Sequence, residues 1–257
     1  GMLMAFIIPP GVSFLIPILG AVMAVYIGKH LLGGLGYNIF NPALLGRAFL
    51  LATFPVAMTS AWLPPLTDGV FFTYFSGGID AITTATPLAV MKEQGMAVFR
   101  ETFGSPATVY PTFFLGLRPG SIGETSGLLI LLGGLYLMYR RYITWHIPVS
   151  VLGSIALLTW IFGGETLFSG DPLLAVLTGG AILGAFYMAT DYVTSPSTRT
   201  AQLAYGVGIG ALTVLIRLKG GYPEGICYAI LLMNPLSTVL DGWFKPKRFA
   251  APLGGEK

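Results

Sequence analysis

Long apolar segments separated by short polar turns restrict the fold of this chain more than any other feature. An α-helix needs about 20 apolar residues to cross a bilayer. Seven segments approach this length, at residues 12–32, 42–62, 123–139, 143–163, 172–190, 199–217 and 222–240. Of the 257 residues, 54% are apolar and only 10% are charged, whereas a soluble domain has roughly 25% charged residues. The sequence therefore predicts a single all-α, polytopic transmembrane domain over residues 1–257.

The remaining composition excludes several classes of protein. A net charge of +3 is typical of cytoplasmic anchors in a membrane protein, so we expect a lipid bilayer and no nucleic acid as partner. The single cysteine, Cys227, cannot form an intrachain disulfide or a Cys-based metal site of its own. His30 and His146 lack a second ligand at metal spacing, so no metal site is predicted. The short apolar run 2–8 stops at a Pro-Pro pair, and we expect it to be the tail of a helix whose start, with any earlier helices, is missing here.

Lysine and arginine residues predict how the domain sits in a bacterial or archaeal cytoplasmic membrane. Loops rich in these residues face the cytoplasm. One set of segment ends carries eight of them: Lys29, Arg47, Arg140, Arg141, Arg199, Lys245, Lys247 and Arg248. The other set carries five: Lys92, Arg100, Arg118, Arg217 and Lys219. The first set and the C-terminus are therefore expected inside, and the stretch 64–109 is expected to be an extracytoplasmic loop.

Several features predict broken helices and a duplicated architecture. The stretch 110–117 lies between Pro111 and Pro119 and is too short to cross, so we expect a half helix or re-entrant segment there. Residues 29–42 and 219–235 share a lysine, a Gly-Gly pair, an aromatic residue and a final Asn-Pro. Duplicated halves with broken segments are typical of transporter-like folds. Glycine pairs four residues apart, such as Gly206 and Gly210, predict close helix contacts.

The most informative stretch surrounds Thr86. Thr86 precedes Pro87, and proline is favoured at the first position of a helix that a threonine caps. The N–H groups and partial positive charge at a helix start favour a phosphate, including one esterified to the Thr86 hydroxyl. The alternative interpretation is an ordinary N-cap threonine.

The run of residues 80–86, Asp-Ala-Ile-Thr-Thr-Ala-Thr, resembles the flavinylation motif Asp-x-x-(Ser/Thr)-(small)-Ala-Thr. Other runs match the same family in order: GGLGYN at 33–38, FNPA at 40–43, GSIGE at 120–124, MATD at 188–191 and VTSP at 193–196. Together they resemble the RnfD subunits of the Rnf ion-translocating ferredoxin:NAD oxidoreductases, with the related NqrB subunits of sodium-pumping NADH:quinone reductases. One departure is Thr84, which stands where glycine is common.

This resemblance implies a transporter-like bundle of two inverted helical repeats with short broken helices, of which the first helices are missing here. It implies a covalent FMN on Thr86, transferred from FAD by a flavin transferase, with Asp80, Thr83, Thr84 and Ala85 completing the motif. It also implies a second, non-covalent flavin, either riboflavin or FMN, which the sequence does not place. The expected partners are a second flavin-bearing subunit and iron–sulfur subunits of a membrane electron-transport complex.

Acidic residues at the ends of apolar segments are a second signal. A charge at bilayer depth costs at least a few kcal/mol, so the presence of Glu124, Asp191 and Glu224 at these positions needs an explanation. One interpretation is a path for sodium ions or protons, with Asp191 and then Glu124 as the main candidates. The other is capping: Glu124 and Glu224 would lie in the first turn of a helix, where an acid suits the dipole, and Asp191 would cap the following loop.

Other polar residues within apolar segments leave two interpretations open. Arg47 could pair with an acid or bind a flavin phosphate, but snorkelling towards the interface is the simpler expectation. Asn38, Asn41 and Asn234 could line a cavity or cap broken helices.

Two functions from different classes follow from these features. The first is a membrane redox subunit that carries covalent FMN and passes electrons in a process coupled to Na+ or H+ translocation. Such a subunit would not be active alone, because it lacks an NAD-binding or Cys-cluster motif. The alternative is a small-solute channel of urea-transporter-like fold, and a third possibility is a structural scaffold.

Overall fold

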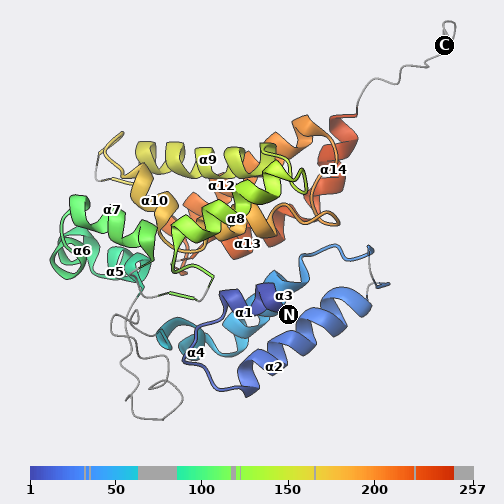
Figure 1. The fold of residues 1–257 in the computed structure, drawn as a ribbon, viewed down its shortest axis with the longest axis horizontal. Helices are drawn as coiled ribbons and strands as arrows, with labels where there is room; N and C mark the ends of the chain where they lie inside the picture. Colours follow the sequence, from blue (N-terminus) through green and yellow to red (C-terminus); the bar gives the residue numbers. More distant parts are fainter. Residues whose placement is uncertain are drawn as a thin grey trace, which may run out of the picture.

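The computed structural model describes residues 1–31, 33–34, 36–62, 86–116, 120–121, 123–164, 166–222 and 224–245. Over these residues the secondary structure is helical, with no strand. The helices, shown in Figure 1, are α1 (Met2–Ile7), α2 (Leu15–Val22), the π-helical η1 (Met23–His30), α3 (Pro42–Thr53), α4 (Pro55–Ser60), α5 (Pro87–Glu93), α6 (Gly95–Phe103), α7 (Pro106–Leu115), α8 (Gly127–Tyr139), α9 (His146–Phe162), α10 (Pro172–Leu177), α11 (Ala181–Leu183), the π-helical η2 (Gly184–Met188), α12 (Arg199–Lys219), α13 (Ile226–Met233) and α14 (Leu236–Trp243).

The helices form two groups with separate apolar cores. Helices α1 to α4 lie together on one side of Figure 1, and α5 to α14 form the larger group. Met4, Leu50 and Met58 belong to the small core between α1, α3 and α4. Ile7 and Leu44 extend from this group into the larger core, so α1 and α3 join the two.

Helices α9 and α12 pack closely against each other within the larger group. Gly206 and Gly210 on α12 face Ser150 and Ser154 on α9. A Cβ atom on either glycine would lie only 1.8 Å from the facing serine Oγ, so no other residue fits without moving the helices apart. This confirms the predicted close contact at the Gly206–Gly210 pair.

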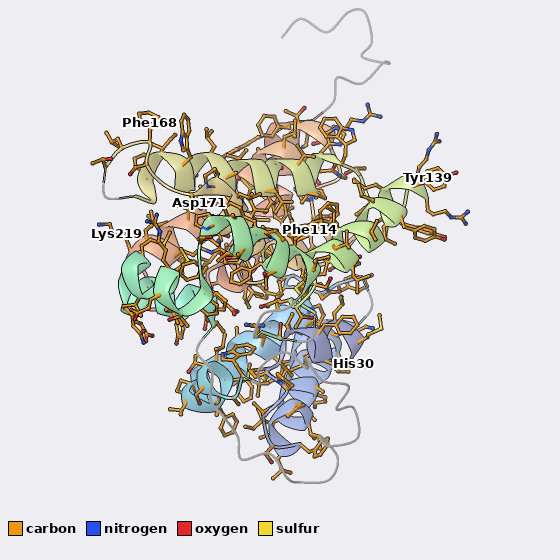
Figure 2. All side chains as sticks on the ribbon, turned by 60° about the vertical axis from the view of Figure 1, so that its left-hand side comes forward. His30, Phe114, Tyr139, Phe168, Asp171 and Lys219 are labelled. Atoms are coloured by element: carbon orange, nitrogen blue, oxygen red, sulfur yellow. The ribbon has the colours of Figure 1, made fainter. Side chains whose placement is uncertain are left out.

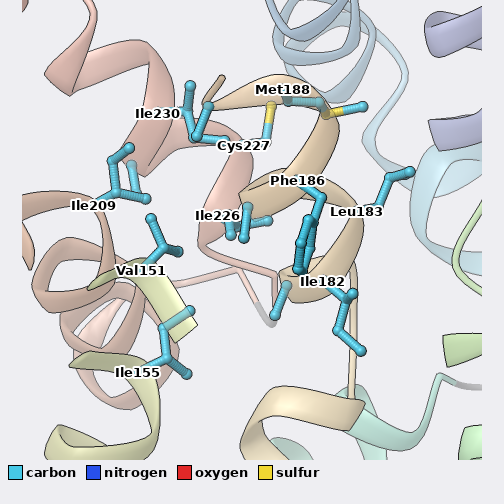
Figure 3. Close-up of a cluster of buried hydrophobic side chains, with 14 of the residues drawn as sticks. Val151, Ile155, Ile182, Leu183, Phe186, Met188, Ile209, Ile226, Cys227 and Ile230 are labelled. Atoms are coloured by element: carbon cyan, nitrogen blue, oxygen red, sulfur yellow. The ribbon is translucent and has the colours of Figure 1, made fainter. Parts of the chain in front are cut away.

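Small and β-branched side chains fill the space between this pair and the broken segments. In Figure 3, Val151 of α9 and Ile209 of α12 lie near Ile226 and Ile230 of α13, with Phe186 of η2 beside them. Ile209 and Ile230 have no exposed surface. The broken segments are therefore held inside the bundle, where neighbouring helices cover their backbone.

Only part of the predicted set of seven continuous spans is confirmed. By length and composition, one described helix, α12, is able to cross a membrane unaided. Helices α13 and α14 pass the same test as a pair, bent by 55°. The predicted spans 42–62 and 172–190 are each interrupted, the first at Phe54 before Pro55 and the second around Gly179. Helices Leu15–His30, Pro42–Thr53, Gly127–Tyr139 and His146–Phe162 are apolar but shorter.

One predicted boundary is wrong. The half helix expected at 110–117 instead starts at Pro106, and α7 continues through Pro111 to Leu115. Proline at the first helical position has its φ angle already set, so the helix begins at the earlier proline. The stretch 64–109, expected to be a loop, contains α5, α6 and the start of α7 in its described part.

The basic residues separate towards the two ends of α12. Arg199 begins this helix and Lys219 ends it. Gln202, in its first turn, accepts a hydrogen bond from Thr144, which is near Arg140 and Arg141. Lys92 binds the carbonyls at the other end, next to Lys219. Figure 2 shows Tyr139, which precedes Arg140, far from Lys219. Arg140, Arg141 and Arg199 of the first predicted set therefore lie at the opposite end of α12 from Lys92 and Lys219 of the second set.

Candidate functional site

Thr86 is the N-cap of α5, as predicted. Its backbone is extended (φ −64°, ψ 149°), and its Oγ1 accepts a hydrogen bond from the Ala89 N–H at 3.2 Å. Pro87 takes the first helical position, as expected from its fixed φ angle. Thr86 is only 7% exposed. The other motif residues, Asp80, Thr83, Thr84 and Ala85, lie outside the described part of the chain.

Lys92 fixes α5 against the end of α12. Its ammonium donates to the carbonyl oxygens of Gly220 at 2.5 Å, Tyr222 at 2.8 Å and Ile216 at 3.4 Å. Partial burial lowers the pKa of Lys92, against a smaller opposing effect of Glu93. The carbonyls at a helix C-terminus are its natural partners, because they lack donors within the helix. In the sequence, Lys92 is recognisable only as a charge at a segment end.

A cavity of about 250 Å³ lies beside α5, and we call it the α5 cavity. Its wall consists of residues from α5, α6, α9, α10, α12 and the turns next to them: Leu88, Met91, Lys92, Met96, Thr159, Gly163, Asp171, Ala175, Thr178, Val214, Arg217 and Leu218. Arg217 donates to the Ala175 carbonyl at 2.6 Å and the Thr178 carbonyl at 3.1 Å. The wall therefore combines apolar side chains with two cationic groups, those of Lys92 and Arg217, and one carboxylate, that of Asp171.

Tyr110 and Asp171 form a second polar contact at this end of the bundle. The Tyr110 hydroxyl donates to Asp171 Oδ2 at 2.5 Å, and the other Asp171 oxygen caps α10 by accepting the Leu174 N–H at 3.0 Å. This hydrogen bond, together with partial burial, raises the pKa of Tyr110 to about 12. Figure 2 shows Asp171 on the same side of the bundle as Lys219. The pair has no signal in the sequence, because its members are 61 positions apart.

Arg47 is the most deeply buried charged residue in the described part of the chain, at 3% exposed. Its guanidinium donates to the Glu224 carboxylate and to the carbonyl of Ile7 at the end of α1. A nitrogen of the same group lies 3.7 Å from Glu124 Oε1. The structure thus confirms pairing with an acid, and the expectation that Arg47 snorkels is wrong.

The capping interpretation of the two glutamates is also wrong. Helix α8 begins at Gly127 with Ser126 as its cap, and α13 begins at Ile226 after Gly225. Glu124 and Glu224 thus precede their helices instead of lying in the first turn. Both point to Arg47, because charged groups removed from water need a partner of opposite sign.

The break between α10 and α11 makes room for these carboxylates. A Cβ atom on Gly180 would lie 2.8 Å from Glu124 Oε1, and one on Gly179 would lie 3.8 Å from Glu224 Cγ. Gly179 also has φ +64°, which a residue with a side chain adopts only with strain. Three breaks in the chain and the end of α1 therefore meet at Arg47.

The two asparagines of the duplicated Asn-Pro pairs lie next to each other. Asn41 caps α3 by accepting the Ala43 and Leu44 N–H groups, and its amide donates to the Met188 carbonyl at 3.2 Å. In the amide orientation of Asn234 that satisfies its neighbours, its oxygen accepts the Asn41 N–H at 2.9 Å. Its nitrogen then reaches Tyr205 Oη at 2.7 Å. These residues cap and join the broken segments. Asn38, also buried, donates to the Phe40 carbonyl at 3.2 Å.

Asp191 lies in the turn between η2 and α12. Burial raises its pKa, partly opposed by hydrogen bonds from the Thr194 hydroxyl, at 3.1 Å, and the Val193 backbone. Its capping role in this turn is therefore observed. Among the described residues, no three carboxylate, thiol or imidazole groups come together in an arrangement that could hold a metal ion.

Comparison with known proteins identifies similar sequences over nearly the whole chain. A family model described as "NQR2, RnfD, RnfE family" matches residues 1–250. The chain is 49% identical over 250 residues to the D subunit of the proton-translocating ferredoxin:NAD(+) oxidoreductase complex of Clostridium ljungdahlii, covering 97% of this chain and 72% of that protein. It is 43% identical over 249 residues to the D subunit of the Na(+)-translocating ferredoxin:NAD(+) oxidoreductase complex of Acetobacterium woodii, covering 96% and 70%. It is 35% identical over 278 aligned positions to the D subunit of the ion-translocating oxidoreductase complex of Halorhodospira halophila, covering 100% and 77%.

Proposed function

The chain belongs to the NQR2, RnfD, RnfE family, and from this premise we propose that it acts as the D subunit of a membrane complex that couples electron transfer between ferredoxin and NAD to ion translocation. The observation that carries this proposal is the 49% identity to such a D subunit over 97% of the chain. The names of two relatives specify protons in one case and Na+ in the other, so both ions are compatible with this sequence.

Within this function, Thr86 is the proposed attachment point of covalent FMN. The motif at residues 80–86 supports the assignment, with Asp80, Thr83, Thr84 and Ala85 as its other members. Thr86 caps the start of α5, whose Val90 belongs to the larger apolar core. Because Thr86 is 7% exposed, we infer that the flavin transferase acts before α5 packs.

The flavin would supply one-electron and two-electron chemistry, and this chain would supply its position. A second flavin-bearing subunit and iron–sulfur subunits are the proposed donors and acceptors, because one cysteine cannot hold a cluster here. A second, non-covalent flavin, riboflavin or FMN, remains part of the proposal without an assigned position.

Asp191 and Glu124 are the proposed members of a cation path. Glu124 is buried and Asp191 is half-buried, and the raised pKa of Asp191 supports a group that binds and releases a proton or exchanges it for Na+. Glu124 differs in that it already faces Arg47 at 3.7 Å. Its role would require Arg47 to pair with Glu224 while Glu124 binds a cation.

The proposed setting is the bacterial or archaeal cytoplasmic membrane, with several spans and the Thr86 end outside. The separation of basic residues along α12 supports this orientation. Two inverted repeats remain part of the proposal, and the two π-helical segments, each followed by a turn and then by a helix, α3 or α12, support it.

Denaturing gel fluorescence tests the flavin assignment. The native complex, matured in a host with its flavin transferase, should give a fluorescent band for this chain and an intact mass increased by one FMN phosphoester. Thr86→Ala should abolish both. Ser126→Ala is the matched control, because Ser126 likewise caps a helix by accepting an N–H, from Leu129 at 3.3 Å.

A bare Thr86 peptide from the native organism would exclude the covalent flavin. The alternative of a small-solute channel would then be tested by solute uptake into liposomes that contain the complex. Uptake that depends on this chain, without flavin, would favour the channel.

A further inference from the structure

The α5 cavity carries an inference beyond the attachment point itself. Its wall begins two residues after Thr86 and includes three side chains of α5, those of Leu88, Met91 and Lys92. A wider open depression that shares Met91, Met96, Gly163 and Asp171 adjoins it. The cavity is therefore continuous with an open depression at this end of the bundle, and Thr86 lies on the same short helix, α5.

We propose that the α5 cavity holds the isoalloxazine ring of an FMN carried by Thr86, with Lys92 and Arg217 as the residues that set its electrostatic environment. The proposal rests on the function proposed above, because it needs the flavin on Thr86. It adds the position of the ring and the residues that tune it.

The distances along α5 allow this placement. An α-helix rises 1.5 Å per residue, so Met91 and Lys92 lie about 7–9 Å along the axis from Thr86. A phosphate and a ribityl chain separate the threonine oxygen from the ring by roughly eight single bonds, and each adds about 1.2 Å when extended. The linker is thus long enough to bring the ring to Met91 and Lys92.

The size and chemistry of the wall also fit the ring. The cavity, at about 250 Å³, is close to the lower limit of roughly 300 Å³ for small-molecule pockets, which suits a ring system without its linker. The isoalloxazine ring has an apolar dimethylbenzene end and a polar pyrimidine end. Met91, Val214 and Leu218 match the first, and the cations of Lys92 and Arg217 match the second.

Both cations are held in place by main-chain carbonyls. Lys92 binds the carbonyls of Gly220 and Tyr222, and Arg217 those of Ala175 and Thr178. They remain near the cavity whether or not a ligand is present. A fixed positive charge beside a flavin favours its reduced form, because that form carries more negative charge. The Asp171 carboxylate in the same wall opposes this effect, but it accepts hydrogen bonds from the Tyr110 hydroxyl and the Leu174 N–H. The two cations outnumber it and should raise the midpoint potential of the flavin.

Redox titration of the covalent flavin in the purified complex tests the charges. Lys92→Met should shift the midpoint potential to a more negative value. Lys219→Met is the matched control: it removes the same charge at the same end of α12, but Lys219 is exposed and does not line the cavity. Equal potentials in wild type and Lys92→Met, or equal shifts in both variants, would overturn the proposal.

A second variant fills the cavity and does not depend on Lys92. In the wild type, the covalent flavin should be protected from quenching by iodide. Met91→Trp should occupy the cavity and raise the quenching constant towards that of free FMN. Gln94→Trp, at an exposed position of α5's C-cap outside the cavity, should leave it unchanged. A flavin already fully accessible in the wild type, or still protected in Met91→Trp, would contradict the placement.

The same samples separate a failure of this inference from a failure of the proposed function. Fluorescence of the denatured chain reports attachment at Thr86 and does not depend on the cavity. A fluorescent chain with unchanged potential and quenching excludes only the placement of the ring. A chain without fluorescence excludes both. A Thr86→Ala complex that keeps a flavin sensitive to Met91→Trp would assign the cavity to a non-covalent flavin and overturn the proposal.

Discussion

Arg47 and Glu224 lie 177 positions apart in the sequence and form an ion pair inside the protein. Arg47 belongs to α3 of the smaller helix group, and Glu224 precedes α13 of the larger one. Glu124 approaches the same guanidinium from the segment before α8. These contacts therefore join the two helix groups at their broken segments. There the buried charges of Arg47, Glu124 and Glu224 are partners for one another.

Removing one member of this pair should destabilise the protein strongly. Glu224→Ala leaves the buried Arg47 without its nearest acid, and breaking a buried pair costs about 3–5 kcal/mol. We expect a lower thermal midpoint in detergent, measured by loss of helical circular dichroism. Arg47→Met combined with Glu224→Met and Glu124→Met removes all three charges and should recover much of the loss, since apolar replacements of buried ion pairs and triads are often nearly neutral. A Glu224→Ala protein as stable as the exposed control Glu93→Ala would contradict the role of the pair.

Gly206 should tolerate no larger residue. A Cβ atom there would lie 1.8 Å from Ser150 Oγ, so Gly206→Val must separate α9 and α12. Overpacking of this kind costs about 1–3 kcal/mol. Gly153→Ala, on α9 itself, is the matched control, because nothing lies within 4 Å of its Cβ position. That variant should be neutral or gain up to about 1 kcal/mol in helix propensity. Unfolding in a denaturing detergent measures the change in the free energy of unfolding of both variants. Equal changes in the two variants would be inconsistent with this packing.

The hydrogen bond between Tyr110 and Asp171 should make the protein less stable at alkaline pH. Its pKa is raised from 10.0 to about 12, mainly by the hydrogen bond to Asp171 and then by burial. A raised pKa means that the stabilisation is complete below pH 10 and is lost as pH rises towards 12. Tyr110→Phe should cost about 1 kcal/mol at pH 8 and show a flatter decline between pH 10 and 12. Tyr139→Phe, at an exposed tyrosine, should follow the wild type. Parallel curves for wild type and Tyr110→Phe would refute the prediction.

Asp191→Asn tests the proposed cation path. The amide keeps the shape of the side chain but cannot carry the charge that a proton or Na+ neutralises. We expect ion transport by the reconstituted complex to fall about tenfold, which corresponds to the loss of roughly 1.4 kcal/mol of ion binding. Covalent flavin content should not change. Asp241→Asn is the control, because it removes an acid with a mainly structural role. The Asp241 carboxylate accepts the N–H groups of Ser197 and Thr198 at the start of α12. Unchanged transport by the Asp191→Asn complex would remove this residue from the path.

Local features of this protein could be predicted from its sequence. The helical class, the cap at Thr86, the close approach at Gly206 and Gly210, and the span predicted at 199–217, which lies within α12, all depend on neighbours within a few positions or on hydropathy along one segment. The positions of the helix breaks were only partly predictable. Pro111 was interpreted as a helix boundary, but α7 begins at Pro106, since more than one nearby proline could have started the helix.

The sequence by itself determined an all-helical chain of apolar segments, the threonine that caps α5 and the order of the family's motifs. The tertiary structure decided what the buried charges do. Glu124 and Glu224 were expected at helix starts, and Arg47 was expected to reach for the interface, but the three meet where broken helices pack together. The physical reason is that a charge without water must find its partner in space, and packing alone decides which distant segments bring that partner within reach.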